Sequence, residues 1–361
     1  MKDILPELNN KDYIMKLDEQ YDFHFCRKDE VEELVEFIDE YWRKNHIFVI
    51  SRELLDWQHF DKVNDRYNFV IAKHKESGKI HSILGFVPTY QFDEKIEAIE
   101  IWPCIWKSRK DIHVKGLGVS LYYYLKSNIP VETFSILGIS EIALSIYKHW
   151  NFTTGKIDQY YYPNKNASEV ISSDRVCNSD ECTHVEGWCL KEIGMDEYVN
   201  IDINSELFNS LNKYKSKNYY INRFFTHPIY KYKFFALIFD GCYKTIFISR
   251  ECEADNIKCL RIVDCIGDIT NIGNVRYELE ALMQNNNYEY IDLISAGISN
   301  SVMQKTGFIN RKNNPDTIIP NYFEPFLKKN IDLDFAFKTI DNEISPIFFK
   351  ADADQDRPNV L

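Results

Sequence analysis

A short glycine loop is the feature of this sequence best suited to chemistry. Gly116 and Gly118 stand between an apolar run that ends at Trp106 and a segment of helical character, Val119–Lys126. Glycines there let the backbone approach a ligand, and a helix N-terminus presents free N–H groups and the positive end of its dipole. The loop therefore predicts an anion site. An ordinary tight turn is the alternative interpretation, because Gly-x-Gly alone is weakly specific.

Basic residues gather on the approach to this loop. They are Lys107, Arg109, Lys110 and Lys115, against the single acid Asp111. This local excess of positive charge contrasts with the whole chain, which has 43 Lys and Arg, 55 Asp and Glu, and a formal net charge of -12. A polyanionic ligand such as a pyrophosphate fits there. The loop is neither a dinucleotide fingerprint, since Leu121 stands where a third glycine belongs, nor a Walker A loop.

The elements that must position the loop alternate between strand and helix. Apolar periodicity predicts strands over Tyr21–Cys26, Tyr67–Lys75, Lys79–Tyr90, Ala98–Trp106, Thr133–Ile139 and Lys156–Tyr162. It predicts helices from Val31 to Trp42 and over Arg52–Phe60, Val119–Lys126 and Glu141–Trp150. This pattern is typical of an α/β domain.

The second half of the chain partly repeats the first. It contains predicted strands at Phe234–Asp240, Thr245–Ser249, Cys259–Ile266 and Tyr288–Ser295, and predicted helices at Ser205–Tyr214, Val275–Gln284 and Ser301–Thr306. The runs 136–140 and 295–299 both end a strand, contain glycine and precede a short helix. We interpret this echo as two copies of one domain. Chance similarity over a few residues is the alternative.

Composition restricts the function classes. The chain has 361 residues, 45% of them hydrophobic and 15% aromatic, so two well-packed domains are expected. The acidic balance argues against nucleic acid and anionic membranes as partners. No secretory signal is visible, and apolar runs such as Phe234–Phe239 are far shorter than the roughly 20 residues of a membrane span. We expect a soluble cytoplasmic protein whose nine cysteines are reduced.

Two blocks in order resemble the motifs of the GNAT acyltransferase superfamily, which uses acyl-CoA. The loop His113-Val114-Lys115-Gly116-Leu117-Gly118 is similar to Gln/Arg-x-x-Gly-x-Gly/Ala, with His113 in place of the first residue. The run from Ser140 to Tyr147, followed by Asn151-Phe152, is similar to Asn-x-x-Ala-x-x-x-Tyr with Gly-Phe, and Ser140 replaces the asparagine. The match covers about residues 20–162.

The resemblance implies an α/β fold of two tandem GNAT-like domains, each a mixed twisted sheet flanked by helices. We expect a domain with the acyl-CoA site at 1–165, a linker at 166–195 and a degenerate GNAT-like domain at 196–361. The second copy has Met303 where the first has Tyr147, and it lacks the Gly-x-Gly loop. It is therefore not expected to bind CoA.

Several further runs resemble a bacterial subgroup of paired GNAT enzymes. They are Asn45–Ile47, Leu55–Trp57, Tyr67–Phe69 with Ile71-Ala72, Ile83–Pro88, Phe225–Tyr232 and the ending Lys350–Asn359. This resemblance implies transfer of a 3-hydroxybutyryl or acetyl group from acyl-CoA to the amino group of a dTDP-linked amino-dideoxy sugar. The product would serve O-antigen, lipopolysaccharide or capsule synthesis. An aminoacyl ligase, a protein N-acetyltransferase and a non-catalytic CoA-binding protein are the alternatives, and a monomer and a homodimer both remain open.

The same resemblance implies roles for individual residues. The predicted CoA contacts are Trp106, His113, Val114, Lys115, Gly116, Leu117, Gly118, Val119 and Ser140. A splayed strand around Trp102–Trp106, disrupted at Pro103, would offer backbone N–H groups to the thioester. Tyr147 is the predicted acid for the leaving thiolate.

The base and the acceptor site are less well defined by the sequence. His46 is the preferred base because histidine titrates near neutrality, with Glu97, Glu100, His149 and water as alternatives. The predicted substrate contacts are Trp57, Glu100, His227 and Tyr230. For Trp57 an ordinary core position competes with this role.

No metal site is predicted. Cys177, Cys182, His184 and Cys189 are zinc-type ligands, but their spacing does not match a zinc motif. The alternating acids Asp352, Asp354 and Asp356 lack the glycine and final glutamate of a calcium loop, and we interpret them as a polar C-terminal tail.

Overall fold

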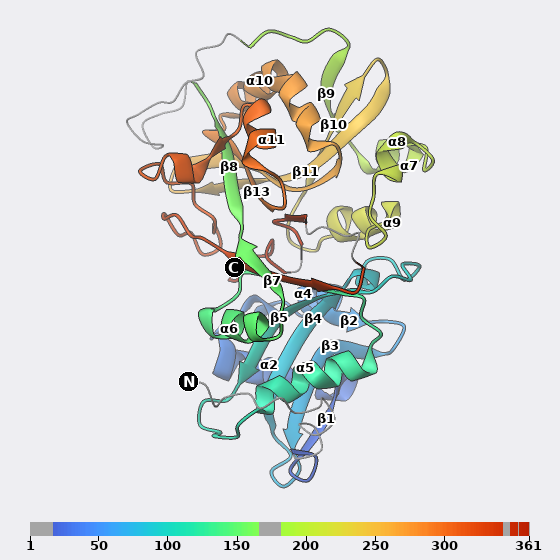
Figure 1. Ribbon diagram of the computed structural model, residues 1–361, viewed down its shortest axis with the longest axis vertical. Coiled ribbons are helices and arrows are strands. Elements are labelled where there is room, and N and C mark those ends of the chain that lie inside the picture. Colours follow the sequence, from blue (N-terminus) through green and yellow to red (C-terminus); the bar gives the residue numbers. More distant parts are fainter. Residues whose placement is uncertain (1–16, 166–181, 342–346, 353, 361) are drawn as a thin grey trace.

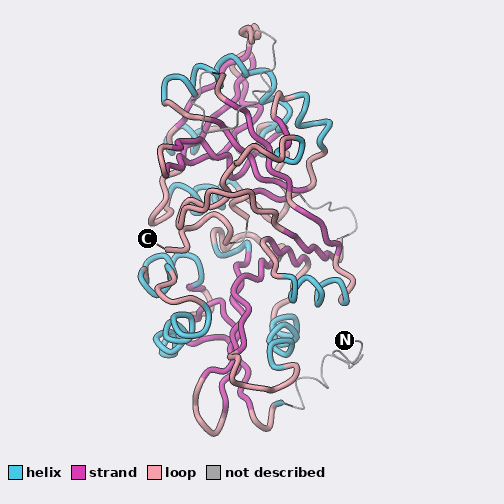
Figure 2. Tube along the Cα trace, turned by 90° about the vertical axis from the view of Figure 1, so that its left-hand side faces the viewer, coloured by secondary structure: helices cyan, strands magenta, loops and turns pink. Residues whose placement is uncertain are grey.

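Two mixed sheets, one above the other along the longest axis, organise the chain (Figure 1). The computed structural model describes residues 17–165, 182–341, 347–352 and 354–360. Helices cover the faces of both sheets. In the sheet of the first half, the lower one in Figure 2, they lie on either side of the strands. Among the described residues, no helix combines the length and the apolar character that a membrane crossing requires.

The first sheet runs in the order β1-β3-β4-β5-β6-β15-β7, with β2 paired to β3. Its strands are β1 (Tyr21–Arg27), β2 (Phe60–Asp61), β3 (Arg66–His74), β4 (Ile80–Pro88), β5 (Glu100–Ser108), β6 (Thr133–Leu137), β7 (Thr153–Lys156) and β15 (Asp334–Thr339). Its helices are η1 (Lys28–Glu30), α2 (Val31–Phe37), η2 (Ile38–Trp42), α3 (Ile47–Ile50), α4 (Arg52–His59), η3 (Thr89–Gln91), α5 (Leu117–Asn128) and α6 (Glu141–His149).

Alternation along β3 explains why both faces of this sheet are covered. Phe69 and Ile71 pack with α2, α3 and α4, whereas Val70 and Ala72 pack with α5 on the other face. Successive side chains of a strand point to opposite faces, so an unbroken apolar run requires cover on both.

The second sheet runs in the order β14-β8-β13-β12-β11-β10-β9, with β16 paired to β13. Its strands are β8 (Asp158–Pro163), β9 (Trp188–Ile193), β10 (Lys233–Phe239), β11 (Cys242–Ala254), β12 (Ile257–Gly267), β13 (Tyr290–Ala296), β14 (Ile309–Asn310) and β16 (Phe348–Phe349). The helices around it are α7 (Met195–Asn200), α8 (Glu206–Asn209), α9 (Lys217–Tyr220), η4 (Ile221–Phe225), η5 (Ile269–Val275), α10 (Arg276–Asn286), α11 (Asn300–Lys305) and η6 (Arg311–Asn313).

The two sheets repeat one plan, which confirms the predicted tandem α/β fold. Each has one parallel pair, β5 with β6 and β12 with β13. Gly138 and Gly297 follow the second strand of each pair at φ of +69° and +86°. Ser140 and Ser299 then cap α6 and α11 in the same way, each side chain accepting from the backbone N–H three residues on.

The halves exchange one strand each. β8, which follows the helices of the first half, pairs with β13 and β14 in the second sheet. β15, near the end of the chain, pairs with β6 and β7 in the first sheet (Figure 1). The strand expected in the first domain therefore belongs to the second sheet. The division at residue 165 stays a prediction. On each side of it, one strand belongs to the sheet of the other half: β8 to the second sheet and β15 to the first.

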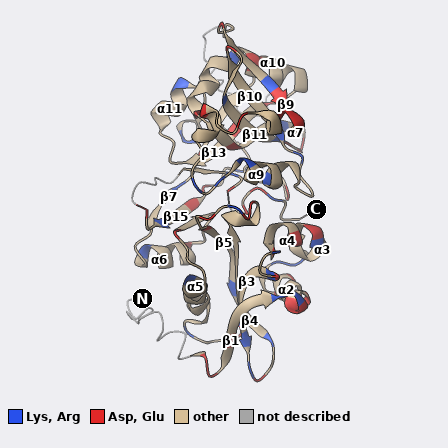
Figure 3. Cartoon of the chain, turned by 90° about the vertical axis from the view of Figure 1, so that its right-hand side faces the viewer, with Lys and Arg blue, Asp and Glu red and all other residues tan. Residues whose placement is uncertain are grey.

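The C-terminal segment, defined as residues 347–352 and 354–360, lies between the sheets, and charged residues occur there as well as on both halves (Figure 3). Asp352, Asp354 and Asp356 are buried, in contrast to the polar tail that we predicted. Each has a cationic partner: Lys215 at 2.8 Å, Arg357 at 2.9 Å and Arg250 at 2.9 Å respectively. Buried carboxylates require such partners, which the sequence pattern did not reveal.

Two predicted helices differ from those observed. The helix from Val31 widens over η2, where the Arg43 N–H donates to the Ile38 carbonyl at 2.9 Å, five residues back. Of the helix expected at Ser205–Tyr214, only Glu206–Asn209 (α8) is helical. The Asn212 side chain accepts from the Tyr214 N–H at 2.9 Å, and such local bonds compete with helix formation.

The strand exchange predicts that the first half does not fold alone. A fragment of residues 1–165 lacks β15, so β6 and β7 lose their shared partner, and β8 has no sheet to join. We expect no cooperative thermal transition for this fragment by circular dichroism, and recovery of the transition when residues 166–361 are co-expressed. A cooperative transition of the isolated fragment would contradict this interdependence.

Candidate functional site

A gap opens in the first sheet between β5 and β6. These strands pair only through Glu100 with Thr133 and Ile101 with Phe134. Beyond them the strands separate, and the pairing of β4 with β5 shifts register between Phe86 opposite Pro103 and Leu84 opposite Trp106. The predicted splayed strand is therefore present, and Pro103, which has no N–H to donate, stands where it begins.

A pocket of about 480 Å³ occupies this gap and continues to the start of α5. Of the predicted CoA contacts it is lined by Trp106, Val114, Gly116, Leu117, Gly118, Val119 and Ser140. His113 and Lys115 do not line it and are exposed. The structure thus brings together the two sequence blocks, although β6 and most of α5 separate them in the chain.

Backbone geometry at the start of α5 explains the two glycines. Gly116 precedes the helix at φ +81°, a left-handed conformation that disfavours other residues. A Cβ on Gly118 would lie 3.1 Å from Ser108 Oγ and 3.2 Å from Trp106 Nε1, and Trp106 Nε1 donates to the Gly118 carbonyl at 3.0 Å. Close approach of α5 to β5 therefore places the first turn of the helix, where N–H groups lack partners within the helix, at the pocket.

The basic residues near the loop are not equivalent. Lys107 lines the pocket. Arg109 instead pairs with Asp111 at 2.6 Å and lies 4.8 Å from the centre of the Tyr41 ring. Lys107 is therefore the cation best placed to meet an anionic ligand in the pocket, and Arg109 contributes mainly to the conformation of the loop.

Tyr147 reaches the pocket from α6. Its ring packs against Trp106, Trp150 and Phe152, and 2% of the residue is exposed. Burial raises the pKa of its phenol, so it is a neutral proton donor near pH 7. No hydrogen bond joins its hydroxyl to another described residue, which leaves the donor available to a ligand in the pocket.

Sequence reasoning missed several residues of the pocket wall. They are Trp42, Ile136, Leu137, Gly138, Ile139, Ile142 and Ile146 among others. Trp42, 42% exposed at the end of η2, is the most informative of them. Trp42 follows the apolar residues of α2 at helical spacing, which indicated a core residue. It lies in the widened turn of η2, and apolar periodicity does not reveal such a turn.

His46 has a different role from the predicted base. It does not line the pocket; it precedes α3, and its Nδ1 accepts from the Phe48 N–H at 3.3 Å. Only 1% of it is exposed, and burial together with Arg357 and Arg43 lowers the pKa of the imidazole to about 2. A base so weak does not deprotonate an ammonium near pH 7. Glu97 and His149 are exposed and lie outside the pocket lining.

Glu100 also lies outside the pocket lining, at the start of β5. It accepts a hydrogen bond from the Ser135 hydroxyl, and burial raises the pKa of its carboxyl to about 8. The carboxyl is therefore neutral at pH 7. It holds β5 and β6 together at the point before they separate.

Trp57, His227 and Tyr230, predicted as substrate contacts, form one stack between the halves. The Trp57 and His227 rings are 4.5 Å apart, and the His227 and Tyr230 rings are 5.3 Å apart. His227 Nδ1 accepts from the Tyr230 N–H at 2.9 Å, and burial lowers the pKa of His227 to about 3. Tyr230 donates to Glu324 at 2.7 Å. These bonds give the stack a structural role at the domain boundary.

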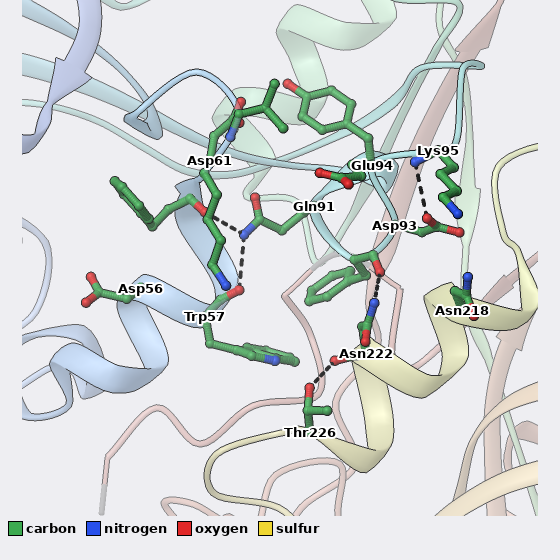
Figure 4. A pocket seen from close by; sticks show the side chains of 15 residues that line it. Asp56, Trp57, Asp61, Gln91, Asp93, Glu94, Lys95, Asn218, Asn222 and Thr226 are labelled. Atoms are coloured by element: carbon green, nitrogen blue, oxygen red, sulfur yellow. Dashed lines mark hydrogen bonds between the residues drawn. The ribbon is translucent and has the colours of Figure 1, made fainter. Parts of the chain in front are cut away.

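Trp57 also lines a second pocket, of about 560 Å³, between α4 and η4 (Figure 4). Its charged lining residues are Asp56, Asp61, Asp93 and Glu94 together with Lys62 and Lys95. Two of the polar lining residues already form hydrogen bonds within the chain. Asp93 accepts from the Lys95 N–H at 3.1 Å, and Asn222 donates to the Phe92 carbonyl at 2.7 Å. The acidic excess makes this pocket a poor site for phosphates.

In the second sheet, described residues of the C-terminal segment occupy the place that corresponds to the gap. β12 and β13 pair from Cys259 with Tyr290 to Ile262 with Leu293. Where they would separate, β16 pairs with Ser295 and Ala296 of β13, and the Ala351 N–H donates to the Val263 carbonyl at 2.9 Å. The C-terminal segment thus fills the position that the pocket holds in the first sheet.

No cluster of three or more metal-ligating side chains occurs in the part of the chain that the structure describes. Cys177 of the zinc-type pattern lies outside those residues. His184 pairs with Glu278 at 2.6 Å, and Cys182 lies 3.5 Å from the Tyr162 hydroxyl.

Comparison with solved structures identifies the architecture. A GCN5-related N-acetyltransferase from Anabaena variabilis matches with a TM-score of 0.56 and 10% identity, over 89% of this chain and 73% of that one. The chain has the fold of GCN5-related N-acetyltransferases. A protein of unknown function from Enterococcus faecalis, described as a probable N-acyltransferase, matches with a TM-score of 0.54 and 10% identity, over 89% and 72%. No family model and no curated protein matches the sequence.

The glycine geometry predicts the effect of a bulky residue at position 116. Gly116→Val should raise the Kd for CoA by roughly tenfold or more, because the strained loop no longer directs its N–H groups into the pocket. Gly241→Val is the matched control: Gly241 has φ +79° and nothing within 4 Å of an added Cβ. Isothermal titration calorimetry checks both, and equal losses in the two variants would contradict the assignment.

The raised pKa of Glu100 predicts a pH-dependent stability. The folded state holds this proton more tightly than the unfolded chain, so the stabilisation is complete below about pH 4.5 and is lost as the pH rises through about 8. Glu100→Gln cannot ionise. We expect the free energy of unfolding of the variant, relative to that of the wild type, to rise by roughly 1 kcal/mol per pH unit between about pH 4.5 and about pH 8. Above that range the difference should stay constant. Denaturant titrations at pH 5 to 9 measure this; a constant difference would refute the shift.

Proposed function

We propose that this chain is an acyl-CoA-dependent N-acyltransferase that acylates the amino group of a dTDP-linked amino-dideoxy sugar, with an acetyl or 3-hydroxybutyryl donor. The pocket between β5 and β6 carries the proposal. It joins an open strand edge, an anion-binding helix N-terminus and an unengaged phenol in one cavity within a GNAT-type fold.

In the proposed complex, CoA lies along this gap. Its pyrophosphate meets the N-terminus of α5 and Lys107, and its pantetheine arm follows the open edge of β5 towards Pro103. Backbone N–H groups on that edge polarise the thioester carbonyl, because they have no strand partner to satisfy them. His113 and Lys115 flank the phosphates from the exposed side of the loop.

The reaction exchanges a thioester for an amide. The neutral amine of the sugar attacks the thioester carbonyl, a C–N bond forms and the C–S bond breaks. The nitrogen loses one proton to water, since His46 is buried away from the pocket, and the thiolate gains one from the Tyr147 phenol. Burial raises the pKa of this phenol and so makes it a weaker acid; the proton therefore moves late, as charge develops on the sulfur, and water afterwards returns a proton to Tyr147.

The nucleotide-sugar acceptor rests on the subgroup resemblance of the sequence. Exposed Trp42 supports it, because an aromatic ring that lines the same pocket as Lys107 suits a sugar or base carrying phosphates. The acidic lining around Trp57 favours an amine over a diphosphate there.

The direct test is product analysis. The purified chain is incubated with acetyl-CoA or 3-hydroxybutyryl-CoA and a panel of dTDP-linked 3-amino and 4-amino dideoxy sugars, followed by mass spectrometry. One acyl mass added to the nucleotide sugar supports the proposal. Acylation of peptides in a parallel panel, with no sugar product, would overturn the acceptor class.

The mechanism predicts the effect of removing the Tyr147 hydroxyl. Tyr147→Phe should lower kcat by roughly 10²-fold and leave KM for acyl-CoA nearly unchanged, because the ring still packs and only the proton donor is lost. Tyr122→Phe is the control, since Tyr122 is buried against Trp150 and does not line the pocket. Unaltered kcat in Tyr147→Phe would remove it from the chemistry.

A further inference from the structure

The acyl-CoA pocket has a thin wall on the side of the second sheet. Leu137 lines the pocket and also lines a separate small cavity of about 10 Å³. The rest of that cavity is apolar except for two residues of the C-terminal segment: it is lined by Ile157, Ile294, Leu333, Phe348, Phe349, Lys350 and Gln355. One layer of side chains therefore separates the pocket from an apolar space between the sheets.

This wall stands at the end of the pocket that is farthest from the start of α5. Counted forward from the paired residues Ile101 and Phe134, Pro103 lies level with Ile136 and Cys104 with Leu137. The loop before α5 follows the other end of β5, after Ser108. A CoA molecule with its pyrophosphate at that loop carries its acyl group towards Leu137.

Gln355 is the residue of the C-terminal segment that packs behind this end, against Gly138. Its side-chain amide approaches Gly138 so closely that an added Cβ would lie 2.7 Å from Oε1 and 2.9 Å from Cδ. Gly138 itself lines the pocket. The glycine thus makes room for the amide directly behind the acyl end.

The surrounding segment holds Gln355 in this position. Its Nε2 donates to Asp354 at 3.2 Å, and Asp354 accepts from Arg357 at 2.9 Å. Phe348, in the same segment, packs its ring 5.4 Å from that of Trp102 on β5. An anchored side chain makes a fixed wall, which is what discrimination by size requires.

From this geometry we propose that Gln355 supports, from behind, the wall of Leu137 and Gly138 that closes the acyl end of the pocket, and thereby restricts the donor to short acyl groups. The inference rests on the proposed function, because it requires acyl-CoA in the gap. Truncation of Gln355 would enlarge the cavity behind Leu137, so that the Leu137 side chain can move into it and the pocket can admit a longer chain.

The test compares the binding of acetyl-CoA and hexanoyl-CoA to Gln355→Ala and to the wild type by isothermal titration calorimetry, without acceptor. The affinity of hexanoyl-CoA relative to acetyl-CoA should rise by roughly tenfold in the variant, as is typical when apolar groups gain space in a pocket. Gln304→Ala, at an exposed position on α11, should leave the ratio at the wild-type value. Thermal melts confirm that each variant is folded.

Each outcome decides between the claims. If the affinity of hexanoyl-CoA relative to acetyl-CoA is unchanged in folded Gln355→Ala, the proposed role of Gln355 is overturned. CoA binding itself would still support the proposed pocket. Absence of CoA binding in the wild type overturns the proposed function and this inference with it. If Gln355→Ala does not fold, Gln355→Leu serves instead, because it fills similar volume without the amide and should retain the short-chain preference. A preference for hexanoyl-CoA in Gln355→Leu would contradict closure by size.

Discussion

The reciprocal exchange of β8 and β15 is the constraint on which the rest of the structure depends. Each sheet is completed by a strand from the other half, so neither can form its hydrogen-bond ladder alone. The exchange brings the C-terminal segment between the sheets, where buried aspartates are matched by Lys215, Arg250 and Arg357. Such pairs fix position more than they add stability, because burying two charges cancels much of their attraction.

That placement makes the two copies unlike. In the first sheet β5 and β6 separate after two residue pairs and leave a lined pocket. In the second sheet the equivalent space receives β16 and the Ala351 N–H, so its backbone groups are satisfied within the chain. Gln355, which packs against Gly138 behind the pocket of the first copy, comes from the same segment that fills the second. One segment thus accounts for both an open site and a closed one.

The sequence predicted the local features of this site well and the long-range ones poorly. The glycine loop and the helix that begins at Glu141 follow from short-range rules, and the structure brings Gly116, Ser140 and Tyr147 into one pocket. Strand exchange, the burial of Asp352 and the position of Gln355 depend on contacts between residues about 130 to 220 positions apart, which periodicity does not encode. The prediction of His46 as the base rested on residue type alone. It did not anticipate that burial lowers the pKa of the imidazole.

The central claim is that the gap between β5 and β6 binds acyl-CoA. A crystal structure of the chain with CoA tests it most directly. The account predicts one CoA per chain, its pyrophosphate at the N-terminus of α5 beside Gly116 and its sulfur between Pro103 and Tyr147. Electron density for CoA between β12 and β13, or in the pocket around Trp57, would contradict it.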